Sequence, residues 1–300
     1  MRNLRIFGRT VGVVLLAGVI GIGTVLAAQK GKPNPNANPN AQGNEGGQSD
    51  SNSGNDSCAG LPSQSALEAA LDAATQLEAS GLNNQMWGTI VDRDGVVCAV
   101  AFTGGDRGAQ WPGSRVISAQ KANTANAFSL DSSSRSDGSG QTNGLALSTA
   151  NLYAAVQPGG SLFGLQFSNP VDPAVAYKGP SIHYGTAHDP MVGRKIGGVN
   201  VFGGGLALYA AGKKIVGGVG VSGDTSCADH NIAWRVRKNL GLDHLAGVSG
   251  VSGDATRPDN IVFDFSPNLN GNPVSSSAGG FGHPTCLNTS GSSSLPVVQP

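Results

Sequence analysis

The strongest chemical signal in the sequence is a glycine-rich turn that leads into a predicted helix. Residues 217–225 read Gly-Gly-Val-Gly-Val-Ser-Gly-Asp-Thr, and Asp229 and His230 follow shortly after. Glycines let a backbone approach a ligand closely, and a helix start offers unpaired N–H groups and the positive end of the helix dipole. The alternative is that Ser226 and Asp229 already satisfy the helix start as a capping pair. The turn residues predicted to hold a carboxylate or phosphate are Ser222, Gly223, Asp224 and Thr225.

Two basic side chains on a predicted helix over residues 114–128 provide counter-charges for such an anion. They are Lys121 and, nearly two turns earlier, Arg115. We expect Lys121 to meet a carboxylate across a pocket, with Arg115 as a second candidate ligand. The alternative is that both side chains extend into solvent, as basic residues on amphipathic helices commonly do.

The turn also has the G-x-G-x-x-G spacing of a dinucleotide-binding fingerprint over residues 218–223, with Asp243 downstream as the acidic residue. In that motif the acidic residue ends a second parallel strand, whereas Asp243 follows the predicted helix within a turn-like Gly-Leu-Asp-His segment. The context therefore argues against NAD. A G-x-S-x-G nucleophile motif and a P-loop are also absent from the sequence.

Helix and strand periodicities place these residues on one mixed domain. The short links within both pairs of strands indicate hairpins, and no parallel crossover is predicted. The fold class is therefore α/β of the α+β kind, an antiparallel sheet with helices laid on it. The predicted elements are a helix over 65–80, strands over 87–91 and 96–102, helices over 114–128 and 143–156, an irregular stretch over 161–198, strands over 205–210 and 214–221, and a helix over 227–240.

Three segments of this pattern occur in an order typical of one known family. They are Trp-Gly-Thr-Ile-Val-Asp-Arg-Asp-Gly at 87–95, Ser-Ala-Gln-Lys-Ala-Asn-Thr-Ala at 118–125 and the glycine turn at 217–225. The chain thereby resembles the GlcG/HbpS family of haem-binding-protein-like domains over about residues 62–242, with an enlarged insertion at about 131–197. The resemblance implies a profilin-like α-β-α arrangement with a five-stranded antiparallel sheet, a haem or similar tetrapyrrole ligand, and assembly into a homo-oligomer.

The sequence departs from that family at the start of the last helix. Family members commonly carry an acidic pair there, whereas this chain has Asp229 followed by His230. A role that needs two carboxylates is therefore in doubt, and a histidine-based role arises. Under the resemblance, His230 and the pair His183 and His188 are candidate iron ligands, with Tyr184 between the pair as a phenolate candidate. Ordinary loop histidines are the alternative, because zinc-site spacing is absent, as is the C-x-x-C-H motif of covalent haem.

All four cysteines follow the N-terminal leader, which is typical of disulfides in an oxidising compartment. The predicted first helix runs antiparallel to the strand after it, so its start should lie near the hairpin at 92–95. Cys58 just precedes that helix and Cys98 just follows the hairpin, so we expect a Cys58–Cys98 bond. Cys227 and Cys286 are then left to join the C-terminal segment to the last helix. The sequence alone permits all three pairings.

Composition divides the chain into four parts. Residues 1–28 join a basic start to an uncharged apolar run that ends in small residues, which predicts a signal peptide and a secreted or extracytoplasmic protein with no membrane attachment after cleavage. The alternative is that the apolar run is retained as a membrane anchor. Residues 29–57 read as a disordered low-complexity linker, 58–286 as the domain and 287–300 as a flexible tail. Without the three leader arginines the formal charge becomes −3, which disfavours nucleic acid as a partner.

Three functions fit these features. The first is an exported haem- or tetrapyrrole-binding protein that stores, scavenges or senses its small-molecule ligand. The second is an enzyme acting on a small carboxylate or on the tetrapyrrole, for which Asp229 and His230 are the candidate acid and base. The third is a surface interaction module without a small ligand.

Overall fold

The structure is a computed structural model that describes residues 57–131, 143–266, 276–289 and 291–300. The predicted signal peptide, and the predicted linker up to residue 56, lie outside the described residues. Within the described ranges, none of the helices has the length and apolar character that crossing a membrane requires.

An antiparallel sheet forms the centre of the domain. Its strands are β1 (Trp87–Asp92), β2 (Val97–Phe102), β4 (Gly205–Ala210) and β5 (Lys214–Ser222), in the order β2-β1-β5-β4. All three neighbouring pairs are antiparallel, which confirms the predicted hairpins. The prediction of five strands in a profilin-like arrangement is not confirmed, because this sheet has four strands in the described part of the chain.

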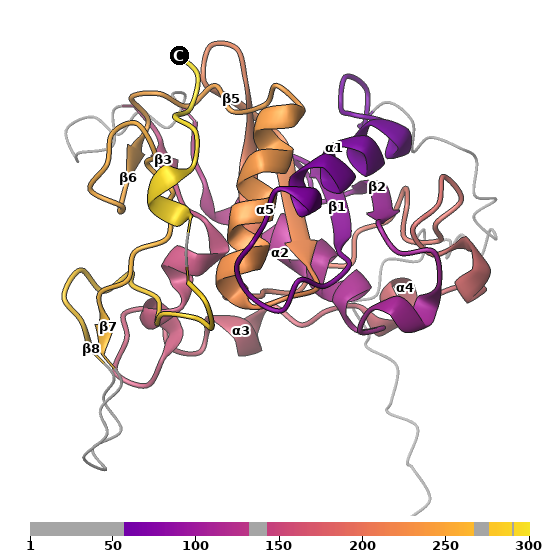
Figure 1. Ribbon diagram of the computed structural model, residues 1–300, viewed down its shortest axis with the longest axis horizontal. Helices are drawn as coiled ribbons and strands as arrows, with labels where there is room; N and C mark the ends of the chain where they lie inside the picture. Colours follow the sequence, from indigo (N-terminus) through magenta and orange to yellow (C-terminus); the bar gives the residue numbers. More distant parts are fainter. Residues whose placement is uncertain (1–56, 132–142, 267–275, 290) are drawn as a thin grey trace, which may run out of the picture. The chain divides into compact units, whose positions relative to one another are not determined.

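Helices cover both faces of the sheet (Figure 1). Helices α1 (Gln64–Gln76) and α5 (Ser226–Asn239) pack on one face, and α2 (Ser114–Phe128) packs on the other. Successive residues of β1 point to opposite faces, as the pleat of a strand requires. Gly88 faces the α1 side chain of Leu71, whereas the next residue, Thr89, shares a 2.8 Å hydrogen bond with Ser118 of α2.

Glycines on β5 allow α2 to lie close to the sheet. A Cβ atom at Gly218 would collide with the backbone of Ala122, and one at Gly220 would collide with the backbone of Ser118. Both contacts join strand to helix backbone, so a side chain at either glycine would push α2 away. The glycine pattern of residues 217–225 is therefore in part a packing feature of this interface.

The predicted third helix over residues 143–156 is wrong. The segment forms a two-residue strand, β3 (Leu145–Ala146), and two short 3₁₀ turns, η3 (Thr149–Leu152) and η4 (Ala154–Val156). Gly144 adopts a positive φ of 85°, which an α-helix does not permit. The Ser148 and Asn151 side chains form a capping box that starts the 3₁₀ turn instead.

The rest of the chain consists of short elements linked by turns. The stretch over 161–198 is largely irregular, as predicted from its glycines and prolines. The last helix begins one residue earlier than predicted, at Ser226, with Thr225 as its N-cap. The remaining elements are η2 (Arg107–Ala109), α3 (Leu165–Ser168), α4 (Pro173–Ala176), η5 (Ser181–His183), β6 (Ser249–Gly250), β7 (Phe265–Ser266), β8 (Ser276–Ser277) and η6 (Ser292–Ser294).

The last ten residues differ from the flexible tail expected after residue 286. Leu295 and Val298 are buried in the same apolar core as α1, α5 and the sheet. The indole N–H of Trp234 on α5 donates a 3.0 Å hydrogen bond to the carbonyl of Pro296. The prediction rested on polar composition, and it missed the two apolar side chains that hold this segment.

Both predicted disulfides are confirmed. Cys58 and Cys98 are joined with a Cα–Cα distance of 5.5 Å, and Cys227 and Cys286 with one of 6.0 Å. The first joins the segment ahead of α1 to β2, and the second joins the start of α5 to the C-terminal segment. His283 lies close enough to Cys227 and Cys286 to complete a metal-ligand group, but the disulfide removes both thiolates from that use.

Candidate functional site

Lys121 and Asp229 form an ion pair sealed inside the domain. The Lys121 Nζ lies 2.6 Å from an Asp229 oxygen, and both side chains are fully buried. The same Nζ donates to the carbonyl of Val221 over 3.0 Å and lies 4.3 Å from the ring centre of Phe202. Helix α2 and helix α5 thus meet through a charged contact across the end of β5.

Burial shifts the proton affinities of this pair in opposite directions. It raises the pKa of Asp229 to about 6, against the attraction of the Lys121 ammonium, and it lowers the pKa of Lys121. The backbone N–H of Asp224 also donates to Asp229 over 2.8 Å. Each charged group therefore has close partners, as buried ions require.

The turn ahead of α5 uses much of its hydrogen-bonding capacity internally. The Thr225 hydroxyl accepts from the backbone of Ala228 as the N-cap, and the Asp224 carboxylate accepts from the backbone N–H groups of Leu82 and Asn84. The carbonyl of Gly223 accepts a 2.7 Å hydrogen bond from the Gln110 side-chain amide, and Ser222 is buried. The structure thus brings Ser222, Gly223, Thr225, Lys121 and Asp229 together, in a largely closed arrangement. Their role as ligands stays a prediction.

Arg115 lies apart from that cluster, in a buried contact with the insertion. Its guanidinium pairs with Asp189 through two nitrogens and donates 2.9 Å to the carbonyl of Ala176. The ring of Tyr184 stacks on it, with 3.6 Å from the guanidinium carbon to the ring centre. Arg115 therefore holds residues 176–189 against α2, and its guanidinium is engaged by these contacts.

His230 is fully buried on α5. Its Nε2 lies 3.2 Å from the Asn260 Oδ1 and 3.3 Å from the backbone nitrogen of Ile261, while its Nδ1 has no hydrogen-bond partner among the described residues. Burial lowers the pKa of His230 to about 4. It is neutral at pH 7 in this site, and it contacts the C-terminal segment rather than the Lys121 cluster.

His183 and His188 are exposed on the surface of the insertion. Their ring centres are 6.1 Å apart, with the rings nearly perpendicular. The structure brings these two histidines together, but in the described residues no hydrogen bond or ring contact joins them to His230, Lys121 or Asp229.

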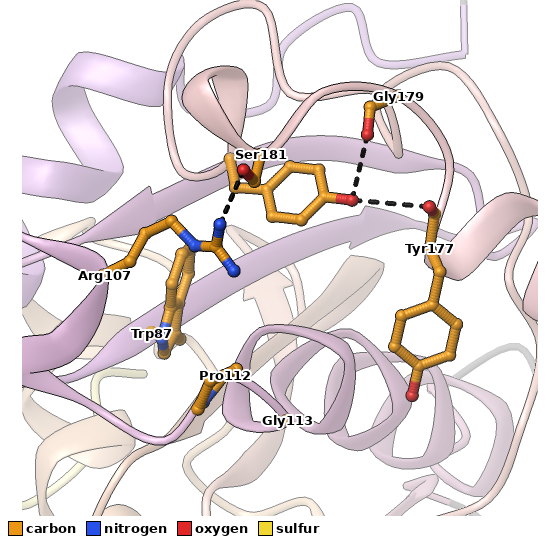
Figure 2. A pocket seen from close by; sticks show the side chains of 8 residues that line it. Trp87, Arg107, Pro112, Gly113, Tyr177, Gly179 and Ser181 are labelled. Carbon is orange, nitrogen blue, oxygen red and sulfur yellow. Dashed lines mark hydrogen bonds between the residues drawn. The ribbon is translucent and has the colours of Figure 1, made fainter.

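A cavity of about 420 Å³ lies between the start of β1 and the insertion (Figure 2). A second hollow of about 460 Å³ shares Arg107, Ser181 and Tyr184 with it. Sequence analysis missed this cavity, although it names two of the lining residues, Trp87 as the start of a family-like segment and Tyr184 as a phenolate candidate. The available signal is a set of aromatic residues in glycine-rich loops. The first cavity is lined by Trp87, Arg107, Pro112, Gly113, Tyr177, Gly179, Ser181 and Tyr184.

Local contacts fix most walls of this cavity. Trp87 stacks on Phe102 with 4.3 Å between ring centres, so the β1–β2 hairpin sets one wall. The Tyr184 hydroxyl donates 3.2 Å to the carbonyl of Gly179, which holds the opposite loop. Arg107 reaches from η2 and donates 2.7 Å to the Ser181 hydroxyl (Figure 2). Flat aromatic walls beside a guanidinium are suited to a planar apolar ligand that carries a negative charge.

The match to a family model agrees with the resemblance found in the sequence. A family model described as haem degrading protein HbpS-like matches residues 61–238. One similar solved structure is a PduOC–haem complex, at 22% identity and a TM-score of 0.37, covering 58% of this chain and 89% of that one. Another is the ORFY protein of Klebsiella pneumoniae, at 22% identity and a TM-score of 0.38, covering 60% of this chain and 90% of that one. No curated protein matches the chain.

Proposed function

Because this chain belongs to the HbpS-like family, whose description names haem, we propose that it binds haem or a related tetrapyrrole. The observation that carries the proposal is the cavity walled by Trp87, Tyr177 and Tyr184, with Arg107 at its edge. We place the ligand there, with storage, scavenging or sensing as the biological role.

The cavity has the size and lining that such a ligand needs. Small-molecule sites typically measure about 300–1,000 Å³ and combine apolar walls with a few polar groups. The two adjoining hollows, of about 420 and 460 Å³, fall in that range. Aromatic rings contribute large apolar contact and stack on a planar macrocycle.

The ligand residues predicted from the sequence remain a second proposed location. Lys121, Ser222, Gly223, Thr225 and Asp229 lie together, but a ligand would have to open a largely closed set of contacts. We favour the Arg107 cavity because it is open already. His183, His188 and His230 stay candidate iron ligands, and the two exposed histidines lie on the loop that borders the cavity.

Haem titration followed in the Soret region tests the location. Tyr177 is 61% exposed and lines the cavity, so Tyr177→Ala removes a wall with little effect on folding. Phe167 is 83% exposed and does not line it, so Phe167→Ala is the matched control. We expect saturable binding by the wild type, about tenfold weaker binding for Tyr177→Ala, and no change for the control. Absence of saturable wild-type binding contradicts the proposal.

The same titration separates the iron ligands. Replacing an axial histidine changes the iron spectrum itself, whereas replacing a neighbouring residue changes only affinity. Spectra of His183→Ala, His188→Ala and His230→Ala, each saturated with haem, therefore show which side chain coordinates. Unchanged spectra in all three variants exclude these histidines as ligands.

An enzyme that degrades its tetrapyrrole is the second candidate, because the family description names haem degradation. Asp229 and His230 were predicted as acid and base, yet both are fully buried and neither lines the described cavity. Bound haem incubated in air with an electron donor distinguishes the two functions. A stable Soret band supports binding alone, and steady loss of the band supports turnover. If the protein binds no tetrapyrrole, the remaining candidate function is a surface interaction module without a small ligand.

We propose further that the protein works outside the cytoplasm. Two disulfides in the domain suit an oxidising compartment. Residues 1–28 have the features of a cleaved signal peptide, so the mature chain is expected to begin at Ala28 or Gln29. The intact mass of material recovered from the growth medium tests this. A mass that retains the apolar run contradicts it.

A further inference from the structure

We propose that the Arg107 cavity recognises a tetrapyrrole by its carboxylate and its ring, so that free acids bind whether or not they carry iron. This inference rests on the proposed function and narrows its ligand class. Arg107 provides the anchor for the carboxylate, and the aromatic walls hold the macrocycle.

Of the residues that the structure describes, Arg107 is the only charged one that lines the first cavity. Its guanidinium is exposed, and it donates to the neutral hydroxyl of Ser181. Among the described residues it forms no ion pair, in contrast to Arg115 and Arg237, which are paired with buried aspartates. A guanidinium has five donors, so Arg107 keeps donors for a ligand carboxylate while it holds Ser181.

The neighbouring carboxylates do not neutralise this site. The Asp106 side chain accepts 2.6 Å from the backbone N–H of Gly108, so it caps its own turn. Glu68 and Asp106 both line the second hollow, and neither lines the first. An anionic group is therefore attracted to the first cavity and repelled by the acidic side of the second hollow.

The first cavity provides few atoms that bind iron. Within the described residues, its lining contains neither histidine, cysteine nor methionine. Tyr184 directs its hydroxyl to backbone carbonyls, which leaves Tyr177 as the available phenol. His183 and His188 lie on the same loop, but neither lines the cavity. The residues that line this cavity therefore suit the macrocycle and the carboxylate of the ligand better than they suit its iron.

Four related ligands test this on the purified, disulfide-bonded protein. They are haem, metal-free protoporphyrin IX, and the dimethyl ester of each, all titrated in the same dilute detergent and followed by quenching of tryptophan fluorescence. Esterification removes the negative charge and keeps the ring. The variants are Arg107→Gln, Arg107→Lys and, as a charge control on the insertion loop that borders the cavity, Lys178→Gln, because Lys178 is exposed and does not line the cavity.

We expect the two free acids to bind the wild type within about threefold of each other, and their esters at least about tenfold more weakly. Arg107→Gln should weaken the binding of the free acids by about tenfold and leave the binding of the esters unchanged. The affinity of Arg107→Lys for the free acids should lie between those of Arg107→Gln and the wild type, and Lys178→Gln should bind all four ligands as the wild type does. Esters that bind as tightly as acids, or haem that binds while the metal-free ring does not, overturn the inference and leave tetrapyrrole binding intact. If none of the four ligands binds, the proposed function fails as well.

Discussion

The Lys121 cluster and the cavity beside Arg107 differ in what their charged side chains contact. The cluster of Lys121, Asp229 and the turn at 221–225 is buried, and its charges have partners within the protein. The cavity beside Arg107 is open, and among the described residues the Arg107 guanidinium has one hydrogen bond, to the neutral Ser181 hydroxyl. The first region joins helices to the sheet, whereas the second offers unsatisfied donors to a ligand.

The comparison shows why a sequence motif and an open cavity need not coincide. The glycine turn and Lys121 belong to the segments that identify the family, and here they pack α2 and α5 against the sheet. Apart from Trp87, the cavity is lined by residues that lie outside those segments. A motif can thus mark what the fold requires of its backbone, while ligand contacts come from more variable loops.

The largest expected effect is on the buried pair. Lys121→Ala leaves the Asp229 carboxylate buried without its counter-ion, which typically costs about 3–5 kcal/mol of unfolding free energy. The double variant Lys121→Met/Asp229→Leu removes both charges and should recover much of the loss. Urea denaturation monitored by circular dichroism measures both. A loss below about 1 kcal/mol for Lys121→Ala would show that the cluster is not structural.

Removing the disulfide at the start of α5 should cause the next largest loss of unfolding free energy. Cys227→Ala/Cys286→Ala frees a segment with a sequence separation of 59 residues, and we expect a loss of about 2–4 kcal/mol. Cys58→Ala/Cys98→Ala, with a separation of 40, is the matched comparison and should cost a similar amount. Unchanged denaturation midpoints in both variants would mean that neither bond restrains the unfolded chain.

His230 should give the domain a pH-dependent stability. Its pKa falls from 6.5 to about 4 on folding, so between these values the unfolded chain binds more protons than the folded one. The contribution of His230 to the free energy of unfolding is complete above pH 6.5. As the pH falls toward 4, this free energy decreases by on the order of 3 kcal/mol. Asp229, whose pKa is raised to about 6, acts in the opposite direction over a similar range. Subtracting the unfolding free energy of His230→Gln from that of the wild type at each pH isolates the contribution of the histidine. A difference that does not change between pH 7 and pH 4 contradicts this prediction.

The smallest expected effect is on the open cavity. Arg107→Gln changes an exposed side chain with one neutral partner, so its unfolding free energy should stay within about 0.5 kcal/mol of the wild type. Thermal denaturation without ligand measures this. A loss of 2 kcal/mol or more would mean that Arg107 holds the loops together, and the contrast between the two regions would disappear.

Sequence reasoning reached the sheet, its hairpins, the main helices and both disulfides, because each depends on local periodicity or on short chain connections. It failed at residues 143–156, where Gly144 and the Ser148 capping box override an apolar pattern that suits a helix. It also missed the packed tail, where Leu295 and Val298 find distant partners. The cavity was out of reach for the same reason, since Trp87, Arg107 and Tyr177 meet only after the insertion folds back on the sheet.

Hydrogen–deuterium exchange with and without saturating haem tests the central claim most directly. It compares both regions in one sample, on the intact protein. We predict slower exchange at residues 104–112 and 177–186, which border the cavity, and no change at 221–229. Slower exchange at 221–229 with 177–186 unchanged would place the ligand at the Lys121 cluster and contradict this account.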